Sequence, residues 1–133
     1  MNPADFIRWI CSILCGIAGF LLGSLDGLLL ALIAFMILDY STGLLTAKVS
    51  RTLSSKVGFV GIARKGLMLA VVSVGHILDA QVFSGDNSVC RSAVIGFYLA
   101  NEGLSILENA GKLGMPLPKK LKKALEQLKN QDD

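Results

Sequence analysis

The chain has 133 residues, of which 53% are hydrophobic, and it carries a formal net charge of +3 at pH 7. A soluble protein this small has too little interior to hide so many apolar side chains, so the composition argues against a soluble domain and favours a membrane protein. The basic residues lie between apolar segments and in the tail without alternating with aromatic residues, which argues against a nucleic-acid partner.

Four apolar segments follow one another along the chain, at about residues 6–22, 27–47, 66–83 and 92–109. A helix needs about 20 residues to cross the ~30 Å hydrocarbon core of a bilayer. We therefore predict an all-α, polytopic membrane protein in which residues 1–109 form four transmembrane helices. Three spans are the alternative, because the fourth segment is short and contains Glu102, whose charge is costly inside a membrane.

The first segment has a stripe of small residues and two of the three cysteines. The stripe consists of Ser12, Gly16, Gly19 and Gly23. Its spacing allows close contact between helices, either within the chain or between copies. Cys11 and Cys15 share a face, but the odd count with Cys90 is unlike a disulfide framework. We interpret the cysteines as small apolar residues, because free cysteine packs as one.

Ionisable residues of the second, third and fourth segments could meet inside a helix bundle. His76 and Asp79 are three residues apart and share one face of the third segment. With Asp39 and Glu102 they are predicted to form one buried polar cluster. A proton relay or a metal site would use such residues, but a structural contact between His76 and Asp79 is the preferred interpretation. No metal, cofactor or catalytic motif is expected, and the chain is not predicted to be an enzyme.

Polar residues recur every three or four positions in the fourth segment, and a helix places them on one continuous face. They are Tyr98, Asn101, Glu102, Ser105, Glu108 and Asn109. Ionisable groups in a bilayer normally face the interior of a bundle or a water-filled path. Two interpretations stay open: the face lines an aqueous lumen once copies assemble, or Glu102 is protonated or paired within a closed bundle.

Positive charge gathers in two regions, the tail and the connection between the second and third segments. The connection contains no acidic residue and five basic ones: Lys48, Arg51, Lys56, Arg64 and Lys65. The other connections hold only Asp26 in one case, and Asp86 with Arg91 in the other. Since basic residues near membrane ends stay in the cytoplasm, four spans place both basic regions and both termini on the cytoplasmic side.

Residues 110–133 are predicted to be a basic cytoplasmic tail. Leucines recur at helical spacing in it, and the other faces carry Lys119, Lys120, Lys122 and Lys123. This pattern predicts a short amphipathic helix. We expect it to lie on anionic lipids of the inner leaflet, where each nearby lysine contributes roughly 1 kcal/mol. Pairing between the tails of several copies is the alternative.

Several short motifs occur in the order and with the spacing of one family of membrane proteins. They are Asp39-Tyr40-Ser41-Thr42-Gly43 with Ala47, Gly61-Ile62-Ala63-Arg64-Lys65, Gly75-His76-Ile77-Leu78-Asp79, the stretch from Arg91 to Asn109, and Gly114-Met115-Pro116-Leu117-Pro118. Over about residues 25–128 the chain resembles the toxin-secretion/phage-lysis holin family. The resemblance implies a phage or prophage protein that forms homo-oligomers in the cytoplasmic membrane of a bacterial host. Its holes would release a cell-wall hydrolase (an endolysin) or a toxin.

A second class of function stays open beside this one. A small proton-coupled transporter or exporter would use an intramembrane carboxylate, here Glu102 or Asp39, as its coupling group. Such transporters often contain internal repeats, and the sequence shows none. The holin is therefore the preferred interpretation.

Overall fold

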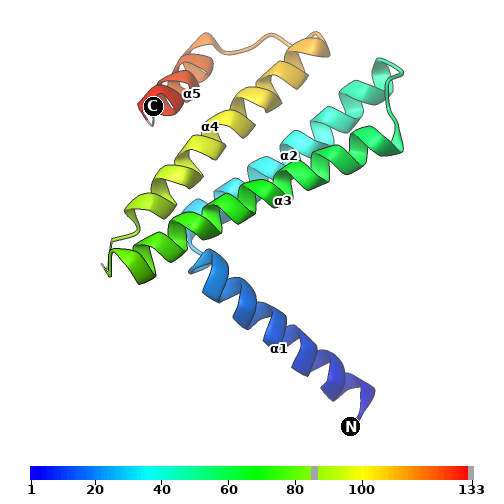
Figure 1. Cartoon of the computed structure of the whole chain (residues 1–133). Coiled ribbons are helices and arrows are strands. Elements are labelled where there is room, and N and C mark those ends of the chain that lie inside the picture. Colours follow the sequence, from blue (N-terminus) through cyan, green and yellow to red (C-terminus); the bar gives the residue numbers. More distant parts are fainter. Residues whose placement is uncertain (85–86, 132–133) are drawn as a thin grey trace.

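The computed structural model describes residues 1–84 and 87–131, and this part of the chain is helical with no strand (Figure 1). Its elements are α1 (Pro3–Leu22), α2 (Gly27–Val49), α3 (Ser55–Ile77), the π-helical turn η1 (Leu78–Val82), α4 (Val89–Lys112) and α5 (Lys119–Gln131). The predicted all-α class is confirmed. Asp86 of the predicted exterior connection lies outside the described residues.

Three helical stretches among the described residues are long and apolar enough to cross a membrane: Pro3–Leu22, Gly27–Val49 and Ser55–Val82. They correspond to the first three predicted segments. The fourth, α4, has 24 residues, which is sufficient length, but it is not among the stretches apolar enough to span. A fourth span therefore remains a prediction.

The start of the third helix differs from the prediction. The apolar run begins near residue 66, but α3 begins at Ser55, where the Ser54 hydroxyl accepts a hydrogen bond from the Val57 backbone N–H at 3.2 Å. Lys56, Arg64 and Lys65 are therefore helical and not part of a connecting loop. Lysine and arginine have good helix propensity, so a change in hydropathy does not by itself end a helix.

The helices α2, α3 and α4 form a bundle, and α1 leaves it at an angle (Figure 1). α2 and α3 are antiparallel, and α4 packs against both of them. The core contains Leu32 and Met36 of α2, Val72 of α3 and Ile95 of α4. None of the residues of α1 is buried; α1 packs against α3, and its last residue, Leu22, also accepts a hydrogen bond from Arg91 of α4.

The predicted amphipathic tail helix is present as α5, which folds back along α4 (Figure 1). The contact is close at Gly103 of α4, where an added Cβ atom would lie 3.0 Å from a methyl carbon of Leu125. The four predicted surface lysines of α5 are exposed. In this structure the tail is therefore attached to the bundle through its apolar side, and its charged side faces outward.

Candidate functional site

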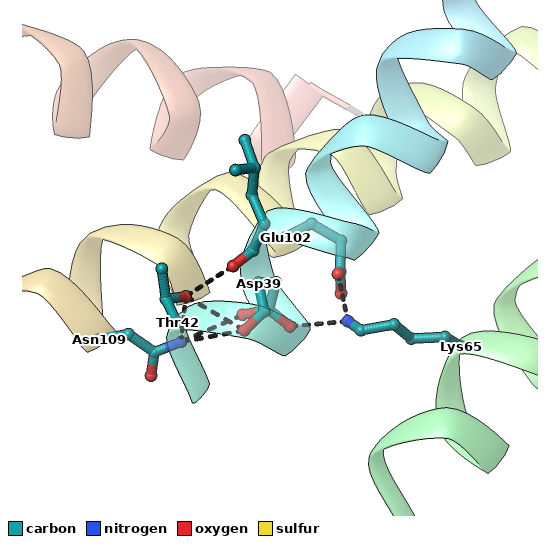
Figure 2. A network of polar contacts seen from close by, with 6 residues as sticks. Asp39, Thr42, Lys65, Glu102 and Asn109 are labelled. Atoms are coloured by element: carbon teal, nitrogen blue, oxygen red, sulfur yellow. Dashed lines mark hydrogen bonds and ion pairs between the residues drawn. The ribbon is translucent and has the colours of Figure 1, made fainter. Parts of the chain in front are cut away.

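The centre of the bundle holds an ionic network that joins all three helices (Figure 2). The Lys65 ammonium group of α3 donates to Asp39 Oδ2 of α2 at 2.7 Å and to Glu102 Oε2 of α4 at 2.5 Å. The three side chains are 14%, 15% and 4% exposed, respectively. One cation thus bridges two carboxylates in a setting with little water, where charge-assisted hydrogen bonds are strong.

A second part of the same network ties α4 to α2 through an amide (Figure 2). The Asn109 Nδ2 group donates to the Thr42 hydroxyl at 3.0 Å and, over 3.4 Å, to the carboxylate and backbone carbonyl of Asp39. Thr42 in turn donates to the backbone carbonyl of Leu38 at 2.8 Å. No buried side-chain nitrogen or oxygen of the described residues lacks a hydrogen-bond partner. The buried polar atoms of the network are therefore all satisfied within the chain.

Lys65 was not among the predicted site residues, because its place before the third apolar segment indicated a connecting loop. A signal was available in the charge balance of the segments. Asp39 and Glu102 are two acids in apolar segments, and buried charges require a partner of opposite sign. Lys65 begins the third apolar run, so it was a nearby cation that could reach them.

A separate polar cluster closes the other end of the bundle around Arg91. Its guanidinium group is 2% exposed and donates to Asp26 at 2.7 Å. It also donates to the backbone carbonyls of Leu22 and Ser24, both at 2.7 Å. Arg91 of α4 thus holds the link between α1 and α2. The hydrogen bond from Arg91 lowers the pKa of Asp26 below its ordinary value.

Asp79 belongs to this second cluster, where it caps α4. The Asp79 carboxylate accepts the backbone N–H groups of Cys90 and Arg91 at 2.9 and 2.8 Å. These are orphan donors of the first turn of α4, and a negative charge at a helix N-terminus is favourable. Ser88, the residue preceding the helix, makes no side-chain cap.

The predicted single cluster is therefore divided into two, and no hydrogen bond or ion pair joins His76 to Asp79 among the described residues. Asp39 and Glu102 do meet, through Lys65, but Asp79 binds the start of α4. His76 lies against Gly23, where an added Cβ atom would be 2.8 Å from the imidazole Nδ1. Gly23 also has φ +80, a conformation that favours glycine, so this residue lets the chain turn out of α1 beside His76.

The predicted polar face of α4 is divided in the structure. Glu102 is buried against Lys65 of α3, Asn109 is buried against α2, and Tyr98 packs partly buried against the apolar core. Ser105 lines a pocket between the helices, Asn101 is half-buried, and Glu108 is exposed. Of the two interpretations left open by the sequence, this structure shows the closed one, in which Glu102 is paired within the chain.

The small-residue stripe of α1 has little to pack against within the chain. Added Cβ atoms at Gly16 and Gly19 would have no atom within 4 Å, and Ser12 is exposed. Cys11 and Cys15 on the same helix are exposed free thiols. Among the described residues, no three histidine, cysteine or acidic side chains gather as a metal ion would require.

Comparisons with known proteins identify the family of this helical membrane chain. Residues 16–130 match the bacteriophage holin family. A Clostridium perfringens protein, an uncharacterized 14.9 kDa protein in the nagH 3' region, is 40% identical over 129 residues, which cover 97% of each chain. An uncharacterized Listeria monocytogenes protein is 45% identical over 106 residues, 80% of this chain and 74% of its own. No solved structure matches the chain. The chain belongs to the bacteriophage holin family.

Proposed function

We propose that copies of this chain assemble in the bacterial cytoplasmic membrane and open holes that release an endolysin or a toxin. The observation that carries the proposal is the polar side of α4, with Glu102 and Asn109 held against Asp39 and Lys65 inside a bundle of apolar helices. Such groups are costly to expose to lipid, so separation of α4 from α2 and α3 requires water. Several copies that turn these groups toward a common lumen would supply it.

The arrangement of α1 supports self-assembly. This helix has 20 residues, none of them buried, and within the described chain it packs against α3 and is bound by Arg91 of α4 at its last residue. Helices in lipid associate through small residues that permit close backbone contact. Gly16 and Gly19 leave an open surface on α1 that a second copy can approach closely.

We propose that both termini are cytoplasmic and that α4 is the fourth span. It packs beside α2 and α3, so it enters the bilayer with them. The basic residues around the link between α2 and α3 then lie on the cytoplasmic side, as the positive-inside rule requires. Arg91 on the opposite side does not conflict with the rule, because it is a single basic residue there against five around the other link, and it is bound by Asp26.

This topology requires α5 to move. Leu125 contacts α4 at Gly103, which is nine residues, or about 14 Å of helix, before the end of α4 at Lys112. If α4 spans the membrane, the lysines of α5 would lie beside hydrocarbon, where each costs about 2.5–3.5 kcal/mol at the centre of the bilayer. We expect α5 to leave α4 on insertion and to bind the anionic inner leaflet.

Timed expression in bacteria with a folded cytoplasmic reporter enzyme tests hole formation. We expect growth to continue for a delay and the folded reporter then to escape abruptly. Glu102→Leu, expressed to the same level, is the matched control: it leaves Lys65 paired with Asp39 and removes the demand for water on α4, so it should stay closed. Escape of small solutes without the reporter, or resistance to toxic compounds without lysis, would contradict the proposal and favour the transporter.

A further inference from the structure

An open pocket of about 400 Å³ lies between α2, α3 and α4, on the side of the bundle near the link between α2 and α3. Its charged lining residues are Lys56, Arg64 and Lys65 of α3 and Asp39 of α2. Lys65 is occupied by Asp39 and Glu102. Neither Lys56 nor Arg64 makes an ion pair with any residue in ranges 1–84 and 87–131. Among the described residues, Lys56 and Arg64 thus line the pocket without an ion-pair partner, since Asp39 is already paired with Lys65.

The position of Arg64 along α3 points to the boundary between lipid headgroups and hydrocarbon. The stretch Ser55–Val82 has 28 residues and is about 42 Å long as a helix, compared with a hydrocarbon core of ~30 Å. About eight residues therefore extend beyond the core. We place them at the N-terminal end of α3, because its basic residues favour the cytoplasmic headgroup layer over hydrocarbon. Arg64 then lies near the start of the hydrocarbon, and Lys56 lies in the headgroup layer.

The remaining walls of the pocket are partly apolar and lie at the level of the lipid headgroups. Leu44 of α2 and Val57 and Val60 of α3 line it, and the two valines are 48% and 44% exposed. Tyr40 lines one side of the pocket, and its position is fixed because its hydroxyl donates a hydrogen bond to the Gly58 carbonyl of α3 at 3.3 Å. Basic pockets between membrane helices on the cytoplasmic side commonly bind anionic lipid headgroups.

We infer that this pocket binds the headgroup of one anionic phospholipid, with the phosphate held between Arg64 and Lys56. The planar guanidinium group of Arg64 can donate two parallel hydrogen bonds to phosphate oxygens, and the ammonium group of Lys56 adds a second positive charge. The inference concerns a lipid site on each chain, and it does not depend on hole formation. Membrane insertion is the condition on which it rests.

The test is a titration of the full chain in a neutral detergent with phosphatidylglycerol, with bound lipid counted by native mass spectrometry. Lys56→Gln with Arg64→Gln should weaken binding of the first lipid at least tenfold. The matched control is Lys48→Gln with Arg51→Gln, which removes the same charge near the same link but outside the pocket lining. It should change binding by less than threefold, and phosphatidylcholine should bind weakly to every variant.

A second variant tests the site independently, in case the double substitution prevents folding. Val60→Trp keeps both cations and fills the pocket from an exposed position, so it too should lose the tightly bound lipid. Equal losses in the two charge pairs, or an unchanged affinity in Val60→Trp, would overturn the site. Inorganic phosphate that binds as tightly as the lipid would show a free-anion site instead. Cross-links from position 64 to a second copy, with no lipid retained, would overturn it in favour of a protein contact.

Discussion

Replacing Lys65 by Met removes the cation of the central network but keeps most of the apolar stem of the side chain. Two carboxylates then remain without their partner, and Glu102 is only 4% exposed. Removing one partner of a buried ion pair typically costs about 3–5 kcal/mol, because the other charge stays buried without compensation. We expect a loss of this size in the free energy of unfolding and earlier lysis, because the closed bundle is less stable.

The assay is reversible unfolding in mixed micelles, followed by helical circular dichroism. Lys56→Met is the matched control: it removes the same kind of charge from an exposed position on the same helix, so its effect should stay within about 0.5 kcal/mol. The triple variant Lys65→Met, Asp39→Asn, Glu102→Gln removes all three charges and should recover most of the stability. A loss below about 1 kcal/mol for Lys65→Met, as for an exposed pair, would refute the reasoning that these groups are shielded from water.

Three further predictions concern α5, α1 and the link to α2. With the native cysteines replaced, the purified chain in lipid vesicles should release an entrapped enzyme only after reduction of a disulfide between Gly103→Cys and Leu125→Cys, because the disulfide holds α5 on α4. Release by the oxidised form would contradict the movement of α5. Gly19→Leu should weaken the association of copies by on the order of 1 kcal/mol, seen as a lower cross-linking yield, and should change lysis timing. Normal timing at normal accumulation would mean that the stripe faces lipid. Because Arg91 lowers the pKa of Asp26, this pair stabilises the fold above the ordinary carboxylate pKa, and its contribution is lost as pH falls through the lowered value. Acid unfolding followed by circular dichroism should therefore be less steep in Asp26→Asn, and an identical pH profile would show that the pair contributes nothing.

The amino-acid sequence by itself determined the helical class and the approximate positions of the membrane segments. Continuous apolar runs of about 20 residues have few alternatives to a membrane helix, because the backbone must satisfy its own hydrogen bonds in lipid. The amphipathic helix α5 was also predictable, since leucines at helical spacing between lysines define its two faces. These features depend on residues close together in the sequence.

Only the tertiary structure decided which charges meet. The contacts of Lys65 with Asp39 and Glu102 join residues 26 and 37 positions apart, and Arg91 binds Asp26 from 65 positions away. Such pairs depend on the rotation and crossing of the packed helices, which hydropathy does not report. The same is true of α4: its polar spacing is visible in the sequence, but packing against α2 and α3 determines that Glu102 and Asn109 face inward while Glu108 stays exposed. In a bilayer that packing matters because a buried charge is tolerated only where a partner lies within hydrogen-bond reach.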